Sequence, residues 1–118
     1  MQILSFKELI VWQKSMILVK FVYQISRKLP AEERFGVASQ MQRCAVSIPS
    51  NIAEGNKRTT AKDYMQFLRT ASGSAAELET QLLIVKDVYN LDVSKELNLL
   101  EEVQKMLQVM KRKLQPIT

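Results

Sequence analysis

Few residues in this sequence have the types and the spacing that catalysis requires. The chain contains no histidine, which excludes Ser-His-Asp triads, imidazole bases and nearly every zinc-ligand pattern. Glu77 and Glu79 are two positions apart, so on a helix they face different sides and cannot form an acid–base pair on one face. The single cysteine, Cys44, lies on an apolar stripe, which is typical of a small buried residue. We therefore expect no enzymatic activity, no cofactor and no bound metal.

Basic residues are stronger candidates for function. The chain has 17 Lys+Arg against 12 Asp+Glu, a formal net charge of +5. Clustered cations are typical of surfaces that bind the phosphates of nucleic acids. The candidate nucleic-acid-binding residues are Lys57, Arg58, Lys62, Lys111, Arg112 and Lys113. The competing interpretation is structural, because basic residues at a helix C-terminus complement the helix dipole and polar loops carry solvated lysines. No recognised nucleic-acid motif accompanies these residues, and aromatic side chains for base stacking are absent from the basic segments.

Apolar residues at intervals of three and four predict four helices that position these side chains. The first helix is expected over residues 7–28, because the residue before Pro30 is biased away from helical angles. Its apolar stripe contains Leu9, Trp12, Met16, Val19 and Tyr23. Other apolar residues widen this stripe, so we expect the helix to be buried on two sides, one of them a subunit interface.

The second helix is predicted to begin between Ala31 and Phe35 and to end at Gly55, in the left-handed conformation that glycine adopts without strain. Pro49 lies inside it and either kinks the helix or begins a new segment. The apolar stripe contains Val37, Met41, Cys44 or Ala45, Ile48 and Ile52.

The third helix has the most regular periodicity in the chain. Thr60 is its predicted N-cap, and its apolar residues form a heptad seam of the kind found in helical bundles. The seam residues are Tyr64, Leu68, Ala71, Ala75, Leu78, Leu82, Val85 and Tyr89. Gly73 costs about 1 kcal/mol relative to alanine inside a helix, so we expect a neighbour to pack closely against it.

The fourth helix is predicted to begin after Ser94 as N-cap and to stop at Pro116. Its apolar stripe contains Leu100, Val103, Leu107, Met110 and Leu114. Linkers of a few residues join all four helices, so neighbouring helices are expected to run antiparallel. The predicted fold class is all-α, an antiparallel up-down-up-down four-helix bundle that forms one domain over residues 1–118.

This topology predicts an uneven charge distribution. It brings the start of the first helix, the second loop, the start of the third helix and the end of the fourth to one end. That end collects seven basic residues, the six candidates and Lys7, against the acidic residues Glu8, Glu54 and Asp63. Basic and acidic residues balance at the other end, so nearly all the excess charge is expected at one end.

The sequence also favours a cytoplasmic location. No apolar run exceeds four residues, which is too short to span a membrane. The N-terminal segment lacks the features of a targeting signal. One unpaired cysteine fits the reducing cytosol, so we expect a cytoplasmic protein with no membrane partner.

Several short motifs form a distinctive set. They are VWQ at 11–13, IPSNIAEG at 48–55, ASGS at 71–74 and ELETQL at 77–82. With them, the chain from Phe6 to about Leu114 resembles the four helix bundle proteins encoded in intervening sequences of bacterial large-subunit ribosomal RNA genes. The resemblance implies a four-helix subunit in a ring-shaped homopentamer, and it implies no established biochemical function.

The resemblance also implies partners. Ribosomal RNA is the expected ligand of such proteins, and the related accessory variability proteins of diversity-generating retroelements bind nucleic acid through basic surfaces and associate with a reverse transcriptase. Our leading hypothesis is therefore a non-enzymatic homo-oligomer that binds RNA or DNA through its basic end. The alternative is a protein-interaction scaffold or an accessory subunit, for example of a reverse transcriptase.

Polar residues of the second and third helices interrupt otherwise apolar stretches. They are Gln40, Arg43, Ser47, Ser50, Asn51, Glu54, Ser72, Ser74 and Glu77. Buried polar groups need hydrogen-bond partners, so we expect a structural network between these two helices that fixes their register and that extends across a subunit boundary.

Overall fold

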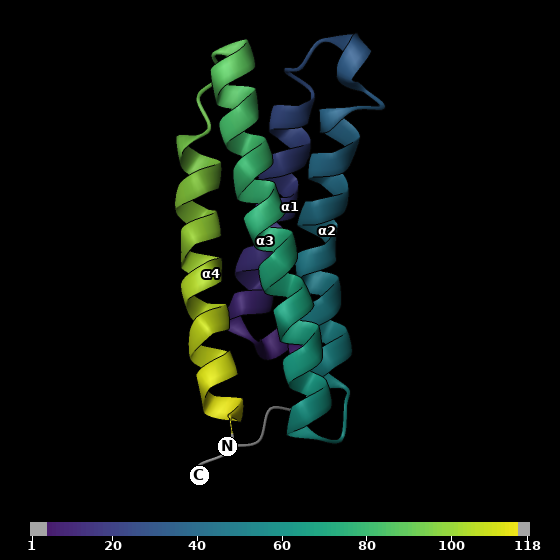
Figure 1. The fold of residues 1–118 in the computed structure, drawn as a ribbon, viewed down its shortest axis with the longest axis vertical. Coiled ribbons are helices and arrows are strands. Elements are labelled where there is room, and N and C mark those ends of the chain that lie inside the picture. The colour runs from purple at the N-terminus through teal and green to yellow at the C-terminus, as the bar shows by residue number, and fades with distance from the viewer. Residues whose placement is uncertain (1–4, 116–118) are drawn as a thin grey trace.

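The computed structural model of the protein describes residues 5–115, and within that range all regular structure is helical (Figure 1). The four α-helices are α1 (Ile10–Ser26), α2 (Val37–Asn56), α3 (Ala61–Tyr89) and α4 (Ser94–Leu114). Two short 3-10 turns, Phe6–Glu8 and Ala31–Glu33, precede α1 and α2. The predicted all-α class with four helices is confirmed.

Helices α1 and α2 begin later than the sequence indicates. Leu9 has extended backbone angles, with φ −72° and ψ 126°, and separates the turn at Phe6–Glu8 from α1. Gly36, with φ −109° and ψ −121°, also has non-helical backbone angles, and it separates α2 from the preceding turn. Helix α2 continues through Pro49 without interruption, so this proline does not begin a new segment.

Side-chain capping is confirmed for α3 and differs for α4. The Thr60 hydroxyl accepts a hydrogen bond from the Asp63 amide at 3.1 Å, as its N-cap role requires. Ser94 is not an N-cap, because it is the first residue of α4. The Asp92 carboxylate instead accepts from the Ser94 amide at 3.0 Å.

Each helix packs against two neighbours. Helix α2 contacts α1 and α3, and α4 contacts the same two helices, so α1 and α3 lie on one diagonal of the bundle. Ser47 lies beside Ser74 and Cys44 beside Glu77, so residue numbers rise along α2 as they fall along α3. Figure 1 shows the start of α1, the α2–α3 loop and the end of α4 at one end of the molecule. The α1–α2 and α3–α4 connections lie at the other end.

The core confirms the heptad seam of α3. Six of its members are buried, and the two tyrosines at its ends are half-buried. On α4, Leu100, Val103 and Leu107 are buried as predicted.

On α1 the core is formed by residues beside the predicted stripe, whose members Leu9, Trp12 and Val19 are half-buried and pack against it. The buried residues are Val11, Ser15, Leu18, Val22, Ile25 and Ser26. The predicted stripe lies to one side, and Met16 and Tyr23 are 39% and 38% exposed. Two apolar patterns with helical spacing overlap in this helix, and the less obvious one passes through Ser15. The Ser15 hydroxyl donates to the Trp12 carbonyl at 2.8 Å, which satisfies its donor inside the core.

Two glycines do not have the roles predicted for them. Gly55 lies inside α2, and no described glycine has a positive φ. A Cβ atom at Gly55 would be 2.9 Å from Phe67 Cβ and 2.9 Å from Tyr64 Cδ1, so the close approach of α3 requires glycine here. Asn90, with φ 54°, has the left-handed conformation that ends α3. Gly73 is exposed, with open space where a Cβ would project, so no described part of the chain packs closely against it.

Candidate functional site

The predicted basic residues gather at one end of the bundle. The α2–α3 loop carries Lys57 and Arg58, and the first turn of α3 carries Lys62. The last turn of α4 carries Lys111, Arg112 and Lys113, and it lies at the same end as the loop (Figure 1). All six side chains are exposed except Lys111, which is half-buried. We call these six residues the basic end.

Cations of the basic end have no acidic partner among residues 5–115. The two ion pairs in this range join Lys14 to Glu102 at 3.2 Å and Lys105 to Glu101 at 2.9 Å. Both pairs lie along the shafts of α1 and α4. Because unpaired, exposed cations keep their full attraction for anions, the basic end is suited to bind phosphate groups.

Aromatic rings support the loop cations. The Lys57 ammonium lies 5.9 Å from the centroid of the Phe6 ring, and the Arg58 guanidinium lies 4.6 Å from that of Phe67. Phe6 is in turn in edge-to-face contact with Trp12 at 5.3 Å. Cation–π contacts of this kind hold charged side chains in place without neutralising them. The sequence alone does not identify Phe6 and Phe67 as supports, because they are separated along the chain from the cations they touch.

The predicted polar network forms only in part. The hydroxyls of Ser47 and Ser74 share a hydrogen bond of 2.7 Å between α2 and α3. Asn51 Nδ2 donates to the Ser47 carbonyl at 2.8 Å and to its hydroxyl at 3.0 Å. The Cys44 thiol donates to Glu77 Oε2 at 3.5 Å.

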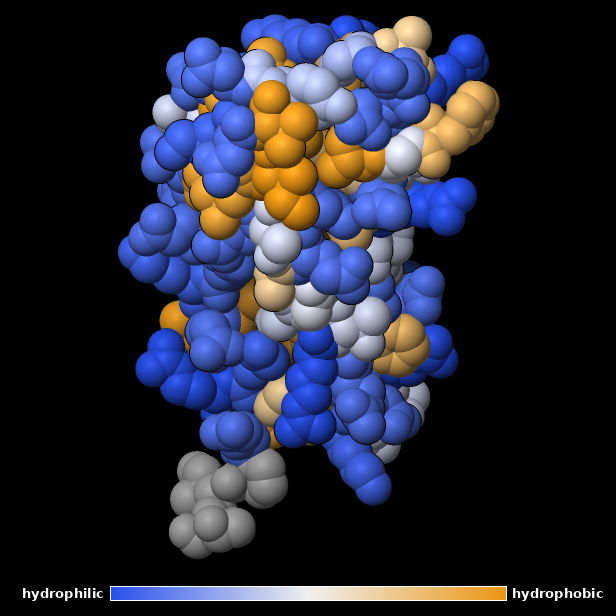
Figure 2. All heavy atoms as spheres, turned by 45° about the horizontal axis from the view of Figure 1, so that its top comes forward, coloured by the Kyte–Doolittle hydropathy of each residue, from blue (hydrophilic) through white to orange (hydrophobic). Residues whose placement is uncertain are grey.

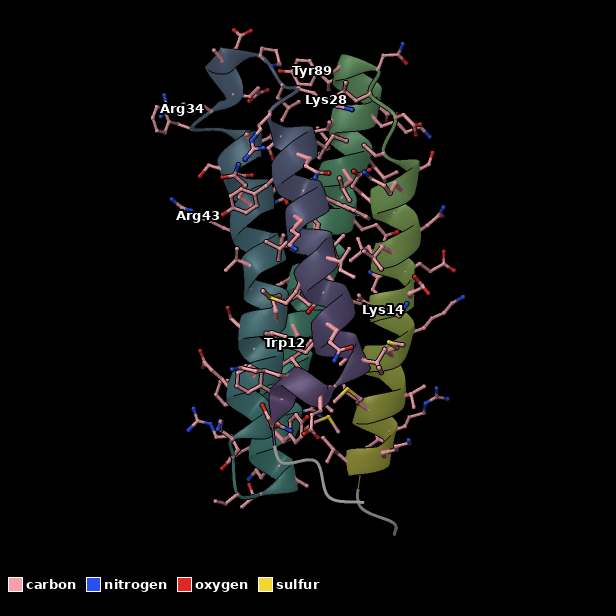
Figure 3. All side chains as sticks on the ribbon, turned by 180° about the vertical axis from the view of Figure 1, so that it is seen from behind. Trp12, Lys14, Lys28, Arg34, Arg43 and Tyr89 are labelled. Carbon is pink, nitrogen blue, oxygen red and sulfur yellow. The ribbon has the colours of Figure 1, made fainter. Side chains whose placement is uncertain are left out.

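The other members of the predicted network point away from it. Gln40, Arg43, Ser50 and Glu54 are exposed, and with the half-buried Ser72 they make no side-chain hydrogen bond to another described residue. Two of them, Arg43 and Ser50, line hollows between α1 and α2. Figure 3 shows Arg43 extending from α2 into solvent.

Groups suited to catalysis or metal binding are few. Burial, and secondarily the nearby Glu77 carboxylate, raises the pKa of the Cys44 thiol, which keeps it protonated and unreactive. Residues 5–115 contain no group of three or more His, Cys, Asp or Glu side chains able to hold a metal ion. In the same range, no helix has the length and apolar character needed to cross a membrane.

The opposite end presents an aromatic side chain. Phe35 is 89% exposed, and the Arg34 guanidinium lies 5.4 Å from the centroid of its ring. The connection that carries it is held by Glu33, which accepts from the Tyr89 hydroxyl and from the Val37 amide at 3.4 Å. The hydrogen bond to Glu33 raises the pKa of Tyr89 to about 12. An exposed aromatic side chain on a loop that hydrogen bonds fix in place is a feature of protein-binding surfaces.

The sequence matches the family described as 23S rRNA-intervening sequence protein over residues 7–112. No match was found among curated proteins.

Proposed function

Because the chain belongs to the 23S rRNA-intervening sequence protein family, we propose that it is a non-enzymatic RNA-binding protein. In this proposal the chain acts as a ring-shaped homopentamer of antiparallel bundles and binds ribosomal RNA through the basic end. DNA is the second candidate ligand. The observation that carries the proposal is the gathering of six exposed or half-exposed cations, without acidic partners among the described residues, at one end of the fold.

The basic end has the chemistry of phosphate recognition. Lysine and arginine contacts to phosphates release counterions, so the binding constant falls steeply with salt concentration. Such contacts position the nucleic acid but read little sequence. We therefore propose binding with weak sequence preference. A ring with parallel subunits would place all its basic ends on one face and multiply the number of phosphates contacted.

A triple variant tests the basic end. Lys57→Gln, Arg58→Gln and Arg112→Gln together should weaken binding to a 23S rRNA fragment at least tenfold at low salt, because three cations are removed from each subunit. Each phosphate that the variant no longer neutralises should also make the slope of log K against log salt shallower by about 0.7 to 0.9. Fluorescence anisotropy titrations at several KCl concentrations measure both effects.

The matched control removes the same charge from the opposite end. Lys28→Gln, Arg34→Gln and Lys95→Gln change three exposed cations, two of which Figure 3 shows at that end. This variant should bind nearly as the parent does. If the first triple variant binds the RNA as tightly as the parent, the basic end is not the binding site.

The exposed Phe35 favours a second function, a scaffold or accessory subunit that binds another protein, for example a reverse transcriptase. The two functions predict different gene neighbourhoods. A location within a ribosomal RNA gene favours RNA binding, and an adjacent reverse transcriptase gene with a repeat pair favours the accessory role.

A further inference from the structure

Three adjoining hollows form a groove along α1 beside α2, apolar near Trp12 and more polar toward Arg27. Its first hollow is lined by Trp12, Met16 and Val19 from α1 and by Val46 from α2. A second hollow shares Val46 with the first. A third hollow shares Val19 with the first and Tyr23 with the second, and it extends the groove to Arg27. From Trp12 to Arg27 the groove follows α1 for about 22 Å, at 1.5 Å per residue. We call this feature the α1–α2 groove.

The outward side of α3 offers a matching ridge. Ile84 and Val88 are 47% and 64% exposed, and Figure 2 shows an apolar patch over this upper part of α3. Gly73 is fifteen positions before Val88, so the ridge from Gly73 to Val88 is also about 22 Å long. A helix packed over Gly73 would explain a glycine that nothing in the described chain requires. We call this feature the α3 ridge.

The groove and the ridge belong to different faces of the bundle. Helices α1 and α3 lie on a diagonal of the bundle, so one copy can present its groove and its ridge at the same time. A contact between two different surfaces of the same chain is heterologous, and it generates a ring when the rotation closes. An isologous dimer would leave one of the two surfaces uncovered.

Charge distinguishes the two surfaces. Lys20, Arg27 and Arg43 line the α1–α2 groove. On the ridge half of α3, Glu77 and Asp87 lie near Ile84 on the helical wheel, whereas Glu79 faces α4 and accepts a hydrogen bond from Gln104 at 3.1 Å. Groove and ridge therefore have opposite charge around their apolar residues, as complementary faces of one interface have.

The heights of the charges also agree. The contact between Cys44 and Glu77 places Arg43, the residue before Cys44, at nearly the same height along the bundle as Glu77. Rotation about a ring axis parallel to the bundle moves a copy without shifting it along that axis. Glu77 of a second copy can therefore face Arg43, which is exposed and has no acidic partner within residues 5–115.

The apolar residues between α1 and α4 are the competing surface. Ile10, Ile17 and Val109 are exposed there. The cations beside them, Lys14 and Lys105, already pair with Glu102 and Glu101. This side therefore lacks the unpaired charge that the groove has.

We infer that the α1–α2 groove of one copy binds the α3 ridge of a second copy, with Arg43 facing Glu77 across the contact. This inference rests on the ring proposed above and assigns its interface. It leaves the basic end, at the far end of the α2–α3 pair, open to solvent and to RNA.

A mixing experiment tests the interface. Met16→Glu damages the groove and leaves the ridge intact, and Ile84→Glu does the reverse. Each variant alone should no longer assemble, and light scattering should give the 13.6 kDa mass of one chain. Its helical circular dichroism spectrum should be the same as the parent's. Mixed in equal amounts, the two should form a species of twice that mass, because one intact groove meets one intact ridge. Ile17→Glu, which changes an exposed residue on the α4 side of α1, is the matched control and should assemble as the parent does.

Charge reversal gives a second test that does not depend on apolar burial. Arg43→Glu or Glu77→Arg alone should lower the assembled fraction at low salt, and the double variant should restore it. The inference is overturned if both apolar variants stay assembled, if their mixture stays monomeric, or if Ile17→Glu alone dissociates the protein. If the parent protein is assembled and one of these results is observed, only the assigned interface is refuted. If the parent protein is itself monomeric, the ring is refuted as well. RNA binding, measured separately, tests the basic end in either case.

Discussion

Gly55 and Gly73 differ in what a methyl group would meet. At Gly55 the new Cβ would lie 2.9 Å from Phe67 Cβ, an atom fixed to the α3 backbone, so α2 and α3 would have to separate. Overpacking of this kind costs about 1 to 3 kcal/mol, against a gain of about 1 kcal/mol in helix propensity. We expect Gly55→Ala to lower the free energy of unfolding by up to about 2 kcal/mol, measured by urea denaturation.

Gly73→Ala is the matched control, because open space surrounds that position. In the Met16→Glu background, where only the single chain is compared, it should raise stability by about 1 kcal/mol. Equal effects of the two substitutions would contradict the close approach of α3 at Gly55.

At the scale of residues, the sequence located the cations but not what surrounds them. Lys57 and Arg58 are recognisable from composition, yet their supports, Phe6 and Phe67, are brought to them only by folding. The polar network shows the same limit. Ser47 and Ser74 meet, whereas Arg43 faces solvent, because spacing along a helix does not show how far a polar stripe turns from the neighbouring helix.

At the scale of elements, α3 and α1 show when helical periodicity identifies the buried face of a helix and when it does not. On α3 only one apolar stripe keeps its spacing over the whole helix, and that stripe is the observed core. The exposed apolar residues Ile84 and Val88 are confined to its last turns. Helix α1 has two apolar stripes with the same period, and Ser15 interrupts the one that is buried. Only the packing of α2 and α4 around α1 decides between them. The remaining stripe forms part of the α1–α2 groove, and the burial of this second side in a subunit interface stays a prediction.

Adjacent aliphatic residues of α1 test which stripe is the core. Leu18 is fully buried and Ile17 is 45% exposed. Leu18→Ala should therefore lower the free energy of unfolding by about 2 to 5 kcal/mol, and Ile17→Ala by less than about 1 kcal/mol. Chemical denaturation followed by circular dichroism measures both. A larger loss for Ile17→Ala would mean that α1 is rotated from the position described.

At the scale of the whole molecule, linker lengths were enough to predict which helix ends meet. Short connections between long helices allow few topologies, so the α2–α3 loop and the end of α4 were expected at one end, as Figure 1 shows. The net charge of +5 is small for one chain, and its effect depends on this concentration at one end. Assembly would increase the local positive charge further, because a ring would join several basic ends on one face. Linkers say nothing about assembly, which depends on surfaces such as the α1–α2 groove.

Assembly should therefore control the salt dependence of RNA binding. Met16→Glu keeps all six cations of the basic end but is expected to be monomeric, so it should contact fewer phosphates per bound particle. The slope of log K against log salt, about −0.9 per contact on a duplex and −0.7 on a single strand, should become shallower than in the parent. Titrations of a 23S rRNA fragment at several KCl concentrations measure it, with Ile17→Glu as an assembled control that keeps the parent's slope. A monomeric Met16→Glu protein with the parent's slope would show that one chain makes every phosphate contact, and the proposed contribution of the ring to RNA binding would be wrong.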